Sequence, residues 1–225
     1  MAAWSSYSLA DLLMFSPDTY LRLFELNNSA LWPLPPVMAA AALALPALTR
    51  KATAKRETVI ALLLGLAWSL VAWGYLYQRY AEINTAAGWF ALAFAAEGLL
   101  LFVAAAMPAA TLSIKGWRCT ATSYPGLALL LYALLCHPLI GILAGRSWRG
   151  AEIFGIAPDP TALGTLGILL MAHGRMPRLL SLLPLAWCLV SALTSIALQQ
   201  PHGLWAPAAA LAALAGTAVL HRLRQ

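Results

Sequence analysis

The most regular feature of the chain is a succession of seven long apolar stretches separated by short polar ones. Each stretch has roughly the 17–25 residues that an α-helix needs to cross ~30 Å of hydrocarbon. We therefore predict an all-helical membrane bundle of about seven transmembrane helices. These helices are expected at residues 29–49, 58–78, 85–107, 123–143, 155–172, 179–199 and 203–220.

The residues before the first stretch, 1–28, are amphipathic but too rich in charge to cross a bilayer. Ser16–Asp18 reads as a helix start, with a capping serine, a proline at the first turn and an acidic residue near the positive helix end. We predict a periplasmic-side segment that lies on the membrane surface, followed by the bundle at 29–225. Its apolar side carries Tyr20, Leu23, Phe24 and Asn27.

The composition supports a lipid environment. Hydrophobic residues make up 62% of the 225 residues and charged residues 10%, whereas soluble proteins have about 25% charged residues. A soluble protein of this size needs a polar surface, which a bilayer makes unnecessary. The net charge of +6 does not indicate a nucleic-acid partner, because the basic residues are dispersed at the ends of apolar stretches.

The distribution of basic residues predicts an orientation. With the N-terminus outside, ten of the 14 Lys and Arg residues fall in the cytoplasmic pieces 50–57, 108–122, 173–178 and 221–225, and four fall outside. An excess of Lys and Arg in the cytoplasmic loops is the rule for multi-pass proteins. We therefore predict an N-terminus outside the cytoplasm and a C-terminus inside.

A short internal similarity suggests a doubled architecture. Leu64–Val71 and Leu183–Val190 are identical at six of eight positions, at an offset of 119 residues. A parallel repeat of 3 + 1 + 3 helices would place repeat A at 29–107, a linker helix at 123–143 and repeat B at 155–220, as in some small transporters. Chance similarity between apolar segments is the alternative.

Glu97 lies near the middle of the predicted helix 85–107. A carboxylate at the bilayer centre costs about 2.5–3.5 kcal/mol on insertion scales, so it should face the bundle interior and be paired or protonated. One interpretation is a proton or cation site, and the other is a neutral glutamate that hydrogen-bonds between packed helices. Ser69 on the helix 58–78 is expected at a similar depth.

Four further polar residues are candidates for the same pathway. His137 precedes Pro138 in the predicted helix 123–143, where it is a ligand, a proton relay or a packed side chain. Ser191 and Ser195 share one face of the helix 179–199. Asp159 stands between two prolines, as either a helix cap or an ion-entry residue.

No motif for enzyme chemistry is present. The chain has no Walker loop, no dinucleotide fingerprint and no nucleophile motif. The remaining histidines lack metal-ligand spacing. We therefore expect no catalysis, no cofactor and no metal site.

Two parts of the chain resemble a family of small bacterial multi-spanning membrane proteins of unknown function. They are Leu12–Pro17 with Leu23–Glu25 and Trp32–Pro33, and Phe154–Gly164. The resemblance implies a location in the bacterial inner membrane. It implies no activity, substrate or catalytic residue.

Our first functional hypothesis is a small membrane transporter or channel, with Glu97 as its central site and the serine face of 179–199 along its path. The sequence does not decide whether the transported substrate is a cation, a proton-coupled solute or an apolar molecule. The alternative is a non-catalytic membrane subunit or sensor that docks a partner protein through residues 1–28. A membrane enzyme or redox protein that uses His137 is a third hypothesis. Whether the chain forms a homo-oligomer is left open.

Overall fold

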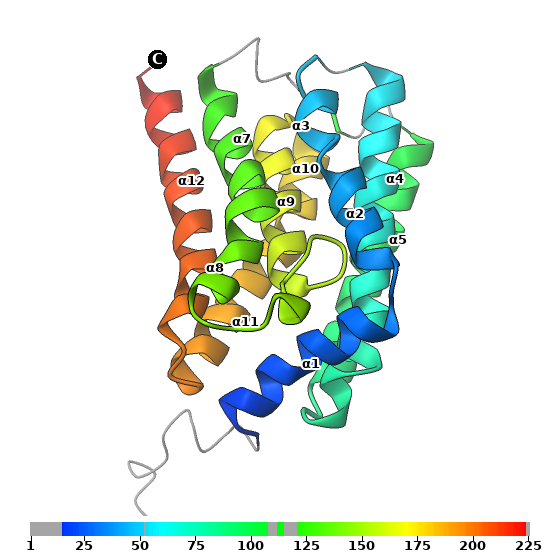
Figure 1. Ribbon diagram of the computed structural model, residues 1–225. Coiled ribbons are helices and arrows are strands. Elements are labelled where there is room, and N and C mark those ends of the chain that lie inside the picture. Colours follow the sequence, from blue (N-terminus) through cyan, green and yellow to red (C-terminus); the bar gives the residue numbers. More distant parts are fainter. Residues whose placement is uncertain (1–14, 52, 108–111, 115–120, 224–225) are drawn as a thin grey trace, which may run out of the picture.

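The computed structural model describes residues 15–51, 53–107, 112–114 and 121–223, which form a helical bundle without a β-sheet (Figure 1). The predicted all-α fold is thus confirmed. The α-helices are α1 (Pro17–Ala30), α2 (Leu34–Ala42), α3 (Leu45–Leu48), α4 (Ala54–Leu70), α5 (Ala87–Ala106), α7 (Tyr124–Leu131), α8 (His137–Leu143), α9 (Pro158–Met171), α10 (Arg175–Leu180), α11 (Leu182–Ala197) and α12 (Trp205–Arg222). A π-helical turn, Val71–Tyr77, extends α4, and a second one, Tyr132–Cys136, joins α7 to α8.

Several of these helices are long and apolar enough to cross a membrane. By length and composition there are five within the described residues: Ala54–Glu82, Ala87–Ala106, Ala121–Leu143, Arg175–Ala197 and Pro201–Arg222. A sixth is obtained if α1 and α2–α3, which are bent by 93° relative to each other, count as one broken span. The expected number of seven full spans is therefore not confirmed.

Two predicted spans differ from expectation. The segment 29–49 is interrupted between α2 and α3, just before Pro46, whose ring removes a helical N–H. The segment 155–172 contains only the 14 residues of α9, about 21 Å of helix, against the ~30 Å of a bilayer core. Thirteen of those residues are buried by the rest of the protein. An apolar sequence indicates removal from water, and here protein rather than lipid provides the cover.

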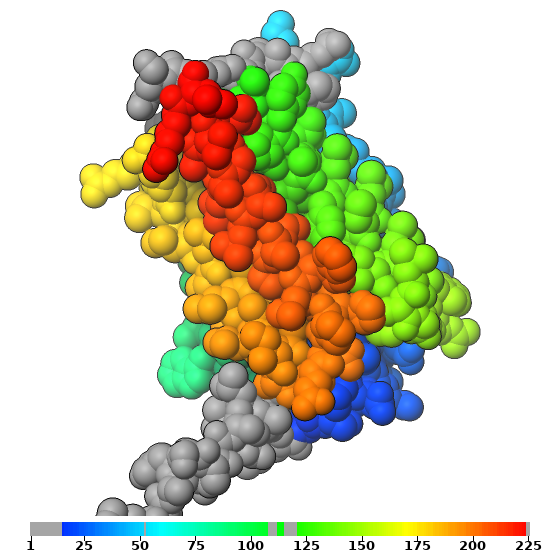
Figure 2. Space-filling model, turned by 90° about the vertical axis from the view of Figure 1, so that its left-hand side faces the viewer, coloured from blue at the N-terminus to red at the C-terminus, as the bar shows by residue number. Residues whose placement is uncertain are grey.

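The short helix α9 is the centre of the bundle, with α4, α7, α11 and α12 packed around it. Its contact with α7 is very close because two glycines face each other. A Cβ atom built on Gly126 would lie 2.5 Å from the carbonyl oxygen of Gly167, and one on Gly167 would lie 2.7 Å from that of Gly126. Small residues allow this approach of two backbones. Helix α12 closes the outside of the bundle between α7 and α11 (Figure 2).

Three buried aromatic side chains, Trp68, Phe94 and Trp187, form a layer across the bundle that we call the aromatic layer. The Phe94 ring centroid lies 4.3 Å from that of Trp68 and 4.9 Å from that of Trp187. Both indoles donate to side chains of α9: Trp68 to Thr165, at 2.8 Å, and Trp187 to Asp159, at 2.7 Å. If a two-fold axis related the two predicted repeats, Trp187 would contact α9 and Trp68 would contact α2–α3, the equivalent part of the other repeat. Both indoles instead contact α9, so the arrangement does not confirm the repeat.

Helix α1 lies across one end of the bundle, which we call the α1 end, and α12 finishes at the opposite end (Figure 1). Leu23, Phe24 and Asn27 are buried, on the one side that the sequence predicts. The Phe24 ring stacks on Tyr75 of the π turn, with 4.7 Å between centroids. The apolar face of α1 is thus covered by the protein's own bundle. Residues 1–14 of the predicted surface segment lie outside the described residues.

Candidate functional site

A cavity of about 260 Å³ opens in the bundle at the α1 end. Its walls come from α1, α8, the loop 144–157, the start of α9, the end of α11 and residues 200–203. The core of the bundle is mostly apolar, so the polar side chains in the wall of this cavity are exceptional. The polar and charged side chains of the wall include His137, Arg146, Glu152, Asp159, Ser191 and Ser195.

His137 reaches the cavity from a distorted helix. Pro138 has no N–H to give to the preceding turn, and the π turn Tyr132–Cys136 lies directly before this pair. The helix is therefore distorted at this pair. The imidazole is 6% exposed, and its Nε2 lies 3.3 Å from Oε2 of Glu152. Turns of this kind are frequent at functional sites because they redirect side chains.

Glu152 is carried into the bundle by the loop between α8 and α9. Helix α1 holds this loop in place, since the Asn28 side-chain amide donates to the carbonyl oxygens of Arg149, at 2.7 Å, and Ala151, at 2.9 Å. These bonds satisfy backbone groups that would otherwise be partly buried without partners. The interaction of α1 with the loop thus fixes the carboxylate that faces His137.

Arg146 completes this ion network. One guanidinium nitrogen donates to Oε1 of Glu152 at 2.9 Å, and the guanidinium occupies the space that a side chain at Gly141 would need. Burial acts to raise the pKa of Glu152, but the hydrogen bond and charge of His137 and the charge of Arg146 outweigh it and lower the pKa to about 2. Glu152 is therefore ionised at neutral pH.

The lowered pKa predicts how acid affects the fold. The Glu152 carboxylate stabilises the folded state fully above its ordinary pKa of 4.5, and this contribution is lost as the pH falls from 4.5 towards 2. The difference in unfolding temperature between the wild type and Glu152→Gln should therefore be large at pH 7 and shrink below pH 4.5. Thermal unfolding in detergent measures it, with the exposed Glu82→Gln as control. A difference that stays constant down to pH 3 contradicts this assignment.

Asp159 occupies the first turn of α9 and is 9% exposed. Its Oδ1 accepts from the Trp187 indole and its Oδ2 from the Ser191 hydroxyl, both at 2.7 Å. The helix-cap interpretation is wrong, because the N-cap position is Ala157 and the Asp159 side chain is directed to α11. The Thr161 hydroxyl accepts from the Gly155 N–H at 2.8 Å, and this bond, rather than one from Asp159, connects the first turn of α9 to the preceding loop.

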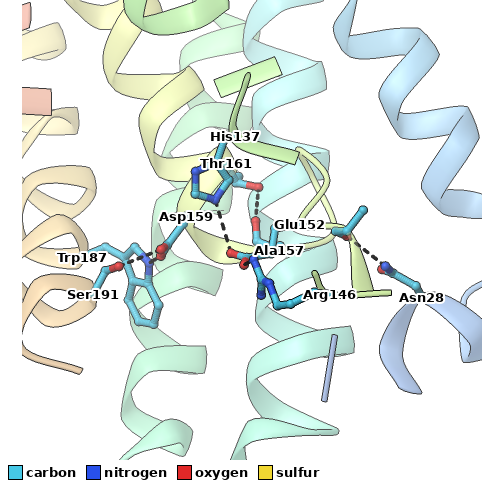
Figure 3. Close-up of polar contacts among 10 residues, drawn as sticks. Asn28, His137, Arg146, Glu152, Ala157, Asp159, Thr161, Trp187 and Ser191 are labelled. Carbon is cyan, nitrogen blue, oxygen red and sulfur yellow. Dashed lines mark hydrogen bonds and ion pairs between the residues drawn. The ribbon is translucent and has the colours of Figure 1, made fainter. Parts of the chain in front are cut away.

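Four of the six sequence-derived candidates line this one cavity: His137, Asp159, Ser191 and Ser195. Figure 3 shows the first three with Glu152, Arg146 and Trp187, contributed by α8, α9, α11 and the loop. The sequence placed them on three predicted helices and did not place them in one cavity. Their convergence is a property of the fold.

Ser69 and Glu97 lie elsewhere. The Ser69 hydroxyl donates to the Gly65 carbonyl at 2.8 Å and lies against Gly98, in the contact between α4 and α5. Glu97 is 3% exposed, and its Oε1 has no hydrogen-bond partner among the described residues. It lies one turn beyond Phe94 on α5, about 4.5 Å further from the α1 end.

Sequence reasoning missed Glu152, Arg146 and Trp187 as site residues. Arg146 and Glu152 were counted only as charges of an outer loop, and Trp187 only as part of the internal similarity. One signal was available: two opposite charges six residues apart in the short loop that follows a membrane histidine. That pattern is weak, because such pairs are common in solvated loops.

The model of a family of unknown function, DUF6064, matches residues 17–225, a range that includes every element of the cavity. The resemblance to a family without an assigned activity is thereby confirmed. No protein of curated function and no solved structure matches the chain.

Proposed function

We propose, from the premise that this chain belongs to DUF6064, a family of unknown function, that it is a multi-pass membrane protein that admits small cations through the cavity at the α1 end. The observation that carries the proposal is the buried set of His137, Glu152 and Asp159 in the wall of that cavity. Because the family has no assigned activity, this geometry is the basis for the function.

The proposed location is the bacterial inner membrane, with the α1 end outside. Large apolar side chains cover the outward faces of the long helices, where water would make them unfavourable. They include Leu62, Leu92, Leu99, Leu211 and Val219, which are 46–67% exposed. In this arrangement five or six long segments cross the bilayer, and the short buried α9 carries the chain inside the bundle from the α1 end to the start of α10. The excess of basic residues at the other end favours the cytoplasm there.

The carboxyl groups of the cavity favour a cation over an anion when the His137 imidazole is neutral. Glu152 and Asp159 provide two carboxyl groups, whereas the one arginine in the wall, Arg146, is already bonded to Glu152. Carboxylates in low-dielectric walls attract cations strongly because little water screens them. Buried acidic residues in membrane proteins commonly mark the paths of ions or protons.

The aromatic layer is the barrier in this proposal. Trp187 donates to Asp159 in the cavity wall, while its ring packs edge-on against Phe94. A cation or proton that reaches Asp159 competes with the indole for the same carboxylate. Release of the indole would loosen the layer and give access to Glu97, the next buried carboxyl group on α5. Transport thus follows the order Asp159, aromatic layer, Glu97.

Ion flux into proteoliposomes tests this function. The purified chain is reconstituted with internal dyes for H⁺, Na⁺ or Zn²⁺, and an inward-negative K⁺ diffusion potential is applied. We expect flux of at least one of these ions above that of empty vesicles. Glu97→Gln should reduce it by about tenfold or more, because the amide keeps the shape of the side chain but neither ionises nor carries a proton.

Glu82→Gln removes an exposed carboxylate of the same helix-rich region and serves as the matched control, with flux expected to equal that of the wild type. Size-exclusion profiles establish that both variants fold. If none of the three ions enters faster than in empty vesicles, or if Glu97→Gln transports like the wild type, the proposed function is wrong.

A further inference from the structure

We propose that His137, Glu152 and Asp159 bind a divalent transition-metal ion such as Zn²⁺. One ligand atom from each of these residues lies within 4.8 Å of the other two. All three residues are at least nine-tenths buried. The inference rests on the proposed function in one respect: the metal is taken to be the cation that enters the cavity.

The donor set selects the class of metal. An imidazole nitrogen with two carboxylate oxygens suits Zn²⁺, Mn²⁺ or Fe²⁺, whereas Ca²⁺ and Mg²⁺ prefer oxygen ligands throughout. Zn²⁺ binds nitrogen and oxygen ligands at about 2.0–2.2 Å. Ligand atoms that already lie within 4.8 Å of one another converge on such an ion through small side-chain rotations.

The surrounding hydrogen bonds orient both carboxylates as metal ligands require. Arg146 bonds to Oε1 of Glu152, so Oε2 is left to face His137. Trp187 and Ser191 fix the two oxygens of Asp159 from one side. Hydrogen-bonding partners of this kind hold ligand orientation and tune affinity in metal sites.

An independent observation comes from the imidazole itself. Nδ1 of His137 is buried and has no hydrogen-bond partner among the described residues. Buried polar atoms nearly always have a partner, so one without any requires an explanation. Nε2 faces Oε2 of Glu152 and Nδ1 has no protein partner, so the described residues leave the bonding capacity of this buried ring partly unfilled.

The site is open, as a cargo site must be. Three protein ligands leave at least one position for water, whereas structural zinc sites use four protein ligands. Metal binding needs a neutral imidazole, because only an unprotonated ring nitrogen can act as a ligand. No sequence motif indicates this metal site, because the ligands come from α8, a loop and α9.

Direct metal binding tests this inference on the purified full-length chain in detergent. After removal of metal with EDTA, equilibrium dialysis against Zn²⁺ at neutral pH and elemental analysis should give about one ion per chain at saturation. His137→Gln, Glu152→Gln and Asp159→Asn should each weaken binding about tenfold or more. His221→Gln, at the far end of α12, and Glu82→Gln are the matched controls and should bind like the wild type.

A spectroscopic readout on the wild type does not depend on the stability of variants. Co²⁺ in a site with one nitrogen and two carboxylate oxygens should give visible absorption bands that Zn²⁺ abolishes by competition. Absence of saturable Zn²⁺ binding to the wild type overturns the inference, and so does equal binding by the wild type and the three folded ligand variants.

These outcomes are distinct from those of the flux assay. Flux of H⁺ or Na⁺ that depends on Glu97, without any Zn²⁺ binding, leaves the proposed function intact and removes the metal site. Stoichiometric Zn²⁺ binding at His137, Glu152 and Asp159 without flux of any ion establishes the metal site and removes the transport function.

Discussion

Replacement of Glu152 by alanine is expected to lower the free energy of unfolding by about 3–5 kcal/mol, the range measured when one partner of a buried ion pair is removed. The variant leaves the Arg146 guanidinium and the His137 imidazole side by side without the carboxylate that both contact. Titration with a denaturing detergent, followed by circular dichroism in mixed micelles, measures the loss. Glu82→Ala, an exposed change of the same type, should alter stability by less than about 0.5 kcal/mol.

The origin of this effect can be separated from a simple loss of packing. The double variant Arg146→Ala with Glu152→Ala should be less destabilised than the sum of the two single variants, because the second change removes the charge that the first one left unpaired. Additive free energies would mean that the two side chains do not interact. A Glu152→Ala variant as stable as the wild type would contradict the network altogether.

The second large effect is expected at the glycine contact between α7 and α9. Gly126→Ala should destabilise the bundle by about 1–3 kcal/mol or more, the usual cost of overpacking. Its added methyl group would lie 2.5 Å from the carbonyl oxygen of Gly167, a backbone atom that has no alternative rotamer. The same unfolding titration measures the change.

Gly88→Ala is the matched control for this substitution. Gly88 lies within α5, where a Cβ atom would meet nothing within 4 Å. Because alanine favours a helix by up to about 1 kcal/mol over glycine, this variant should be as stable as the wild type or slightly more stable. Equal effects of the two substitutions would show that helix propensity, and not the contact of α7 with α9, determines the result.

The Gly126 contact also bears on the candidate site. Helix α7 continues through the π turn to His137, and α9 begins one residue before Asp159. A shift of these two helices relative to each other would separate the imidazole from the Asp159 carboxylate. Gly126→Ala is therefore expected to weaken Zn²⁺ binding even where the chain remains folded, whereas Gly88→Ala is not.

Some features followed from the sequence because they depend on local properties. The helix expected at 85–107 is α5, Ala87–Ala106, and that at 123–143 is the stretch Ala121–Leu143. Long runs of apolar residues form helices wherever water is excluded, here even across Pro125 and Pro138, so these boundaries needed no tertiary information. The burial of Glu97 followed in the same way, from its position in the middle of such a run.

Other features depended on which surfaces meet. Hydropathy indicates that a segment is removed from water, but not whether lipid or protein surrounds it. The segment 155–172 was therefore predicted to be a membrane span, whereas α9 is a helix buried by the rest of the protein. In the same way His137, Asp159 and Ser191 were separate polar residues on three predicted helices, and Glu152 a loop charge. Only the close packing of α7 on α9 and the pinning of the loop by α1 bring these groups within bonding distance, because contacts between distant residues are set by tertiary packing rather than by local pattern.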